Sequence, residues 1–122
     1  MIRQFTSKTQ KIGESGENAA VWYLVKQGFR IMERNIPNKY GEIDIVAKKR
    51  GIYYFYEVKT TWQGSWFNPA DNMTSAKIRK FLISVEYYCL MNTVKEYRAR
   101  ALIVKLPAQE GGEAQIEFLD VA

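Results

Sequence analysis

The chain of 122 residues is basic and contains no histidine: 18 lysines and arginines stand against 13 aspartates and glutamates, a net charge of +5. This length predicts one domain with a core of its own. Without histidine the commonest general base and transition-metal ligand is missing, and the single Cys89 excludes a disulfide framework or a thiolate zinc site. Catalysis would therefore depend on carboxylates, lysine, tyrosine or a hard metal ion bound through oxygen.

The charge is unevenly distributed along the chain. Residues 1–105 carry all 18 cations and 9 of the 13 acids, a net +9, whereas residues 106–122 carry four acids and no cation. A basic body favours a polyanionic partner such as nucleic acid, and the alternative is a soluble surface with an acidic last strand. No apolar run approaches the roughly 20 residues that span a membrane, and the N-terminus lacks a secretory signal. We expect a cytoplasmic protein with no membrane contact.

The N-terminal third predicts an arm followed by a helix. Residues 1–12 are polar and mixed, so we expect a loose arm there and a single domain over residues 13–122. A helix is predicted over residues 15–27, ended by Gly28. Glu17 lies at the N-terminal end of its inward apolar stripe, where it either interacts only with the helix dipole or faces a functional site.

Alternation and turn residues predict the strands. The expected strands are residues 29–34, 42–47, 52–58, 99–106 and 115–119. The short connection between the second and third makes these two strands an antiparallel hairpin.

The remaining segments are two links and a second helix. Residues 35–41 and 60–73 are predicted to be links. A helix begins after the N-cap Thr74 and carries an apolar stripe: Ile78, Phe81, Leu82, Val85, Tyr88 and Cys89. The order of helix, three strands, helix and two strands predicts an α/β domain with one mixed sheet and flanking helices.

Asp44, Glu57 and Lys59 are charged residues within the otherwise apolar hairpin. A turn centred near residue 50 brings Asp44 beside Glu57, and Glu57 and Lys59 point to one face. Two adjacent carboxylates repel each other, and one gains a proton unless a cation bridges them. Magnesium suits such a site, and Lys59 could orient a water or neutralise a phosphate. A structural ion-pair cluster is the alternative.

Cations and aromatic residues gather around this hairpin in sequence. Lys77, Arg79 and Lys80 crowd the start of the second helix, where they oppose its dipole unless a phosphate binds. We expect them to contact a nucleic-acid backbone, and the alternative is an exposed basic face. In the 60–73 link, Trp62, Trp66 and Phe67 could stack bases or form a homodimer contact, but pinning the loop to the core is favoured.

The ordered motifs resemble a known family. Asp44 followed by Glu57-x-Lys59 is similar to the PD-(D/E)xK nuclease pattern. More closely, the chain resembles the YraN-like family of small bacterial proteins with a restriction-endonuclease-like fold. The resemblance covers roughly residues 13–105 and is carried by Gly16-Glu17 with Ala19 and Ala20, Tyr23-Leu24, Gly28-Phe29, residues 41–46, residues 57–60, Pro69 and Lys77.

The resemblance implies roles for these residues. It implies Asp44 and Glu57 as ligands of Mg²⁺ or Mn²⁺, Lys59 as the catalytic lysine, and Glu17 as the helix carboxylate that related resolvase-type nucleases place beside the metal. Glu42 is the alternative carboxylate of its strand. The implied activity is endonucleolytic hydrolysis of DNA phosphodiester bonds, with a resolvase-type or repair-type substrate.

One departure from the family keeps two alternatives open. The family usually shows a basic residue shortly after the catalytic lysine, and here Thr61 and Trp62 stand in that stretch. This difference favours a non-catalytic nucleic-acid-binding module on the same fold. A protein-interaction domain with a closed salt-bridge network is the other alternative.

Overall fold

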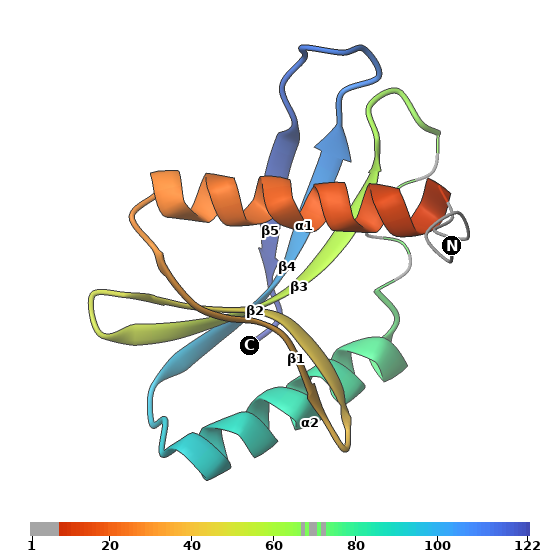
Figure 1. Ribbon diagram of the computed structural model, residues 1–122. Helices are drawn as coiled ribbons and strands as arrows, with labels where there is room; N and C mark the ends of the chain where they lie inside the picture. The colour runs from red at the N-terminus through yellow and green to blue at the C-terminus, as the bar shows by residue number, and fades with distance from the viewer. Residues whose placement is uncertain (1–7, 67, 69–70, 72) are drawn as a thin grey trace, which may run out of the picture.

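The computed structural model describes residues 8–66, 68, 71 and 73–122. Two helices and five strands follow one another as predicted: α1 (Lys8–Lys26), β1 (Arg30–Asn38), β2 (Gly41–Lys49), β3 (Ile52–Trp62), α2 (Ser75–Asn92), β4 (Tyr97–Leu106) and β5 (Gln115–Asp120). The expected α/β order is confirmed (Figure 1).

The strands form one mixed sheet in the order β1-β2-β3-β4-β5. β3 and β4 pair parallel with α2 as the connection between them, and the other neighbours pair antiparallel. The β2–β3 hairpin closes through Arg50 and Gly51, both with positive φ (51° and 82°). This conformation is typical of the type I′ turns that match the twist of two-residue hairpins.

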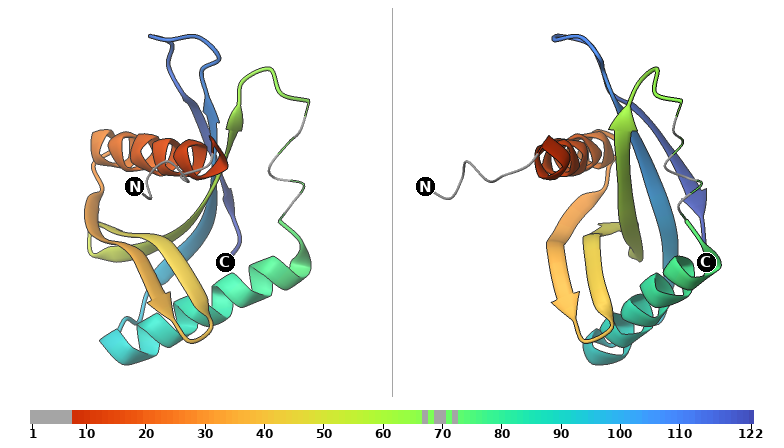
Figure 2. Two further views of the ribbon diagram at one scale, coloured as in Figure 1. Left: turned by 45° about the vertical axis from the view of Figure 1, so that its right-hand side comes forward. Right: turned by 90° about the vertical axis from the view of Figure 1, so that its right-hand side faces the viewer.

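The two helices cover opposite faces of the sheet (Figure 2). On the α1 face, Ala20 and Leu24 pack against buried residues of the sheet: Ile45, Ala47, Tyr56, Leu102, Val104 and Leu106. On the α2 face, the predicted apolar stripe, apart from Ile78, packs against Ile43, Val46, Phe55 and Ala99. The sheet is therefore buried on both faces, as expected when a parallel crossover adds a helix layer.

Several element ends differ from the sequence-based expectation. α1 begins at Lys8, so residues 8–12 are helical rather than a loose arm, and residues 1–7 lie outside the described residues. β1 continues to Asn38, through the first part of the expected 35–41 link. β3 continues to Trp62, because its parallel pairing with β4 extends as far as Trp62↔Leu106. Pro37 is tolerated within β1 because β1 is an edge strand.

The start of α2 agrees with the prediction. Thr74 is the N-cap, and its side chain accepts a hydrogen bond from the backbone N–H of Lys77 (3.3 Å). This bond satisfies one of the free N–H groups of the first helical turn. Neither described helix is both long and apolar enough to cross a membrane.

Two glycines let the helices approach the strands closely. A Cβ at Gly16 of α1 would lie 2.0 Å from Oγ1 of Thr60 in β3. Gly41 has φ 149°, and a Cβ there would lie 3.1 Å from Oγ of Ser84 in α2. Asn38 strengthens the second contact, since its side-chain amide donates to the backbone carbonyl of Ser84 (3.2 Å). The β1–β2 turn is therefore held against α2, and the cavity described next lies where they meet.

Candidate active site

Charged side chains from β2, β3 and α2 meet around one cavity of about 300 Å³. It is lined by Gly41, Glu42, Asp44, Glu57, Lys59, Lys77, Lys80, Phe81 and Ser84. The structure thus brings Asp44, Glu57 and Lys59 together, as predicted from a hairpin turn centred near residue 50. It adds two of the three predicted cations of α2, whereas Arg79 is exposed and does not line the cavity.

Asp44 lies where the β2–β3 ladder ends. The last pair on this side is Ile45↔Tyr56, and the carboxylate of Asp44 then accepts a hydrogen bond from the backbone N–H of Val58 (2.8 Å). The pKa of Asp44 is raised to about 6, chiefly by burial. The Val58 hydrogen bond lowers the pKa, and the nearby charges of Glu57, Glu17 and Glu42 contribute to the rise. A carboxylate with so high a pKa is poorly compensated by the protein around it.

Glu57 is only partly compensated as well. Its Oε2 is buried and meets no hydrogen-bond donor within the described part of the chain. Its Oε1 lies 3.9 Å from Nζ of Lys59, a long ion pair between two partly buried side chains. Leaving a buried polar atom without a partner costs about 1–3 kcal/mol, and more where the group is charged, so such atoms are uncommon in native proteins.

Three cations line the same cavity. Lys59 comes from β3, and Lys77 and Lys80 come from the first turns of α2. The first turn of α2 has no acidic residue, so these ammonium groups add to the positive end of the helix dipole. The site therefore places cations beside the carboxylates, an arrangement that suits a phosphate contacting a metal ion.

Glu17 lies near the cavity but does not line it. The Gly16–Thr60 approach brings this part of α1 against β3, and Glu17 is close enough to raise the pKa of Asp44. Its carboxylate accepts hydrogen bonds from the guanidinium of Arg34 (3.2 Å), which also donates to Asn18 (2.8 Å). Sequence reasoning missed Arg34, because nothing in an alternating edge strand signals a partner 17 residues away.

The carboxylates of the cavity could hold a hard divalent cation. The described residues contain no group of three His, Cys, Asp or Glu side chains arranged to hold a metal. Magnesium needs fewer, because it usually binds through one or two carboxylates, waters and substrate phosphates. The unpartnered Oε2 of Glu57 and the raised pKa of Asp44 both fit a missing positive charge at this position.

The aromatic residues of the 60–73 link do not behave as expected. Trp62 belongs to β3 and is 44% exposed, and Trp66 is 95% exposed. Pinning of the loop to the core is therefore wrong for Trp66. Phe67 lies outside the described residues. Thr61, which stands where the resemblance led us to expect a basic residue, is buried.

A second cavity, of about 420 Å³, lies on the α1 face between the end of α1 and the β2–β3 hairpin. Two of its three cations, Lys49 and Arg100, already make contacts within the fold. Lys49 donates to the carbonyl of Gln27 (2.7 Å), and Arg100 pairs with Asp120 (2.8 Å) while its guanidinium stacks on the Phe118 ring. The cavity around Asp44 has the less compensated charges.

Comparison with known proteins places the chain in a family. Residues 16–106 match the family described as "Uncharacterised protein family UPF0102". The chain belongs to the UPF0102 family. This membership confirms the YraN-like resemblance. The matched residues 16–106 of this chain include Glu17 and every residue that lines the cavity around Asp44, and they do not include β5.

Relatives from several bacteria cover most of the chain. A UPF0102 protein of a Nitratiruptor species is 35% identical over 99 residues, 80% of this chain and 86% of the relative. The UPF0102 protein of Trichlorobacter lovleyi is 38% identical over 111 residues, 90% of this chain and 87% of the relative. The UPF0102 protein of Campylobacter fetus subsp. fetus is 42% identical over 83 residues, 68% of this chain and 72% of the relative.

Proposed function

We propose that this UPF0102 protein is a metal-dependent nuclease that hydrolyses DNA phosphodiester bonds at the cavity around Asp44. The observation that supports this most is the pair of under-compensated carboxylates, Asp44 and Glu57, next to three lysines. A bound cation would compensate the negative charges of the two carboxylates, and a bound anion would compensate the positive charges of the lysines. A divalent cation together with a phosphate group satisfies both needs at once.

Asp44 and Glu57 would hold Mg²⁺ or Mn²⁺. When bound, the ion would polarise the scissile phosphate and lower the pKa of an attacking water. Lys59, whose Nζ lies 3.9 Å from Oε1 of Glu57, would hold that water or stabilise charge that develops on the phosphate. Lys77 and Lys80 would bind neighbouring phosphates of the strand, with the positive end of α2 behind them.

Glu17 is proposed as a further carboxylate of this site. Its charge already acts on Asp44, but its side chain is held by Arg34. Joining the metal would require Glu17 to leave that pair, which is partly exposed and therefore weak. DNA is the proposed substrate because the first 105 residues carry a net charge of +9, with all 18 cations against 9 acids.

A cleavage assay tests the proposal. The purified protein is incubated with branched, single-stranded and duplex DNA in Mg²⁺ or Mn²⁺, alongside Asp44→Asn, Lys59→Ala and the control Glu110→Gln, an exposed loop residue. We expect cleavage of at least one DNA form, lost in the first two variants and retained in the control. Absence of cleavage with every DNA form and both metals, or full activity in Asp44→Asn, overturns the proposal.

A non-catalytic nucleic-acid-binding module is the second candidate. Two observations favour it: Lys59 is already in an ion pair with Glu57, and Thr61 is buried where the resemblance led us to expect a cation. Calorimetry separates the two functions. A module binds DNA in a salt-dependent way without taking up metal, whereas the nuclease takes up Mg²⁺ or Mn²⁺ at Asp44 and Glu57.

A further inference from the structure

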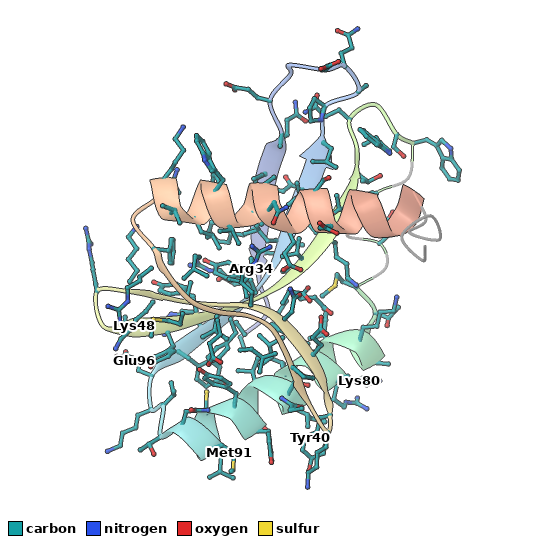
Figure 3. The ribbon with its side chains drawn as sticks, in the orientation of Figure 1. Arg34, Tyr40, Lys48, Lys80, Met91 and Glu96 are labelled. Atoms are coloured by element: carbon teal, nitrogen blue, oxygen red, sulfur yellow. The ribbon has the colours of Figure 1, made fainter. Side chains whose placement is uncertain are left out.

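The outer face of α2 carries apolar side chains that the core does not use. Leu90, Met91 and Ile83 are 78%, 63% and 38% exposed. Figure 3 shows Met91 below α2, on the side away from the sheet, and Tyr40 at the tip of the β1–β2 turn. The opposite side of the helix is already filled by its buried residues, Phe81, Ser84, Val85, Tyr88 and Cys89. The exposed side chains are therefore a second apolar surface of the same helix.

These side chains follow a helical spacing. Ala76, Ile83 and Leu90 recur every seven residues, and Tyr87 lies between Ile83 and Leu90 on the same side. Tyr40 from the β1–β2 turn packs edge-on against Tyr87, with ring centroids 5.5 Å apart. We call Ala76, Ile83, Tyr87, Leu90 and Met91 the α2 stripe. The stripe is apolar from Ile83 to Met91, and Arg79 and Lys80 separate that part from Ala76. An apolar stripe on the outer face of a helix is the surface that helix pairing buries.

We propose that the α2 stripe is the interface of a symmetric homodimer, in which the α2 helices of two copies pack antiparallel. This inference does not depend on the proposed nuclease activity. In a pairing centred on Ile83, Ala76 lies opposite Leu90 of the partner subunit, so that a small residue accommodates a large one. The two Ile83 side chains then meet at the symmetry axis, as an isologous interface requires.

Charges beside the stripe select this partner and this direction. Arg79 follows Ala76 by three residues and Glu86 follows Ile83 by three, so both flank the stripe on one side, and both are exposed. Antiparallel pairing about Ile83 brings Arg79 near the partner's Glu86, and symmetry repeats this ion pair. It also sets the cation-rich start of each α2 beside the negative end of the other helix.

The proposed interface borders the candidate active site at Lys80, which follows Ala76 by four residues and precedes Ile83 by three. Lys77 and Lys80 line the cavity around Asp44, whereas Arg79 does not. The same segment of α2 thus divides its cations between two surfaces. This division gives Arg79 a partner that the DNA-binding prediction did not supply.

Sedimentation velocity over a range of protein concentrations tests the interface. We expect the wild-type protein to form dimers, and Leu90→Glu to remain monomeric with an unchanged circular dichroism spectrum. The matched control is Val25→Glu, which places the same charge at a 55% exposed apolar residue of α1 and should still dimerise. A monomeric wild-type protein, or equal dimerisation by Leu90→Glu and wild type, overturns the proposal.

Charge reversal tests the direction of the helices. Arg79→Glu and Glu86→Arg should each weaken the dimer roughly tenfold or more, because each sets like charges against each other twice. A mixture of these two variants should form heterodimers with wild-type affinity, since both contacts then join opposite charges. Failure of the mixture to restore affinity overturns the antiparallel arrangement, even if Leu90→Glu abolishes the dimer.

Discussion

The carboxylate of Asp44 accepts a hydrogen bond from the backbone N–H of Val58 (2.8 Å), just beyond the last ladder pair of β2 and β3. At the end of the hairpin this side chain therefore accepts a backbone N–H hydrogen bond from β3, as the backbone carbonyls of β2 do within the ladder. Because one oxygen of Asp44 is used in this way, its position relative to Glu57 is fixed before any ligand binds. This fixed position underlies the predictions for the cavity that follow.

Replacing Asp44 by asparagine should stabilise the protein at neutral pH. Burial raises the pKa of Asp44 from 3.8 to about 6, so the folded state binds this proton more tightly than the unfolded chain does. The free energy of unfolding therefore falls as the pH rises from about 4 to about 6, and the full penalty persists above pH 6. An asparagine keeps an acceptor for Val58 and removes the charge.

We expect Asp44→Asn to be more stable than wild type by about 1–3 kcal/mol at pH 7.5. The two proteins should be of similar stability near pH 4, because Asp44 is then protonated in the wild type. Urea denaturation at both pH values measures this. A stability difference that does not change with pH would show that the charge of Asp44 is not its source.

Divalent cations should stabilise the wild-type protein through the same carboxylates. A ligand that binds only the folded state adds stability, about 2.7 kcal/mol at a hundredfold excess over its Kd. Mg²⁺ or Mn²⁺ at pH 7.5 should therefore raise the melting temperature of the wild type, and EDTA should reverse the rise. The rise should be lost in Asp44→Asn and Glu57→Gln and kept in Glu110→Gln. A melting temperature that divalent cations leave unchanged contradicts a metal site here.

Lys77 and Lys80 should contribute to DNA affinity in a salt-dependent way. Each phosphate contact releases counterions, so its loss reduces the slope of log K against log salt by about 1. We expect this reduction for Lys77→Ala and for Lys80→Ala in fluorescence-anisotropy titrations at several salt concentrations. Lys95→Ala, an exposed cation beyond the end of α2, serves as the control. Equal slopes for all three variants would place the DNA elsewhere.

Local rules predicted the relation of Asp44 to Glu57. A two-residue turn fixes the register of a hairpin, and the observed pair Ile45↔Tyr56 makes Asp44 and Glu57 the next residues on their strands. Helix spacing could also have predicted that Arg79 lies apart from Lys77 and Lys80. Lys77, Lys80 and Ser84 follow the i, i+3, i+7 spacing of one helix face, and Arg79 does not.

Tertiary pairing decided what local rules missed. The length of β3 depends on its partner β4, whose pairing continues to Leu106 although residues 60–62 are polar or aromatic. The contact of Glu17 with Arg34 joins α1 to an edge strand, and no periodicity within either element encodes it. Strand ends and contacts between elements are set by the assembled sheet, so the sequence of a single segment underdetermines them.

Variants of Glu17 and Arg34 should move the pKa of Asp44 in opposite directions. The charge of Glu17 raises this pKa, so Glu17→Gln should lower it. Arg34→Gln removes the cation that pairs with Glu17 and should raise it. NMR titration of the Asp44 carboxyl carbon reads both shifts. If neither variant moves the titration midpoint, Glu17 is too far from Asp44 to share a metal ion with it.

Replacing Gly16 by alanine should destabilise the protein, although alanine normally favours a helix by about 1 kcal/mol over glycine. The new Cβ would lie 2.0 Å from Oγ1 and 2.4 Å from Cγ2 of Thr60, so α1 and β3 must move apart. Such overpacking typically costs about 1–3 kcal/mol, which exceeds the gain in helix propensity.

Ser15→Ala, an exposed neighbour in the same helix, is the control and should be neutral or stabilising. Thr60→Ala removes the two closest atoms and should restore part of the stability of Gly16→Ala, which urea denaturation of the single and double variants measures. Additive effects of the two substitutions would show that the contact between α1 and β3 does not limit the size of residue 16.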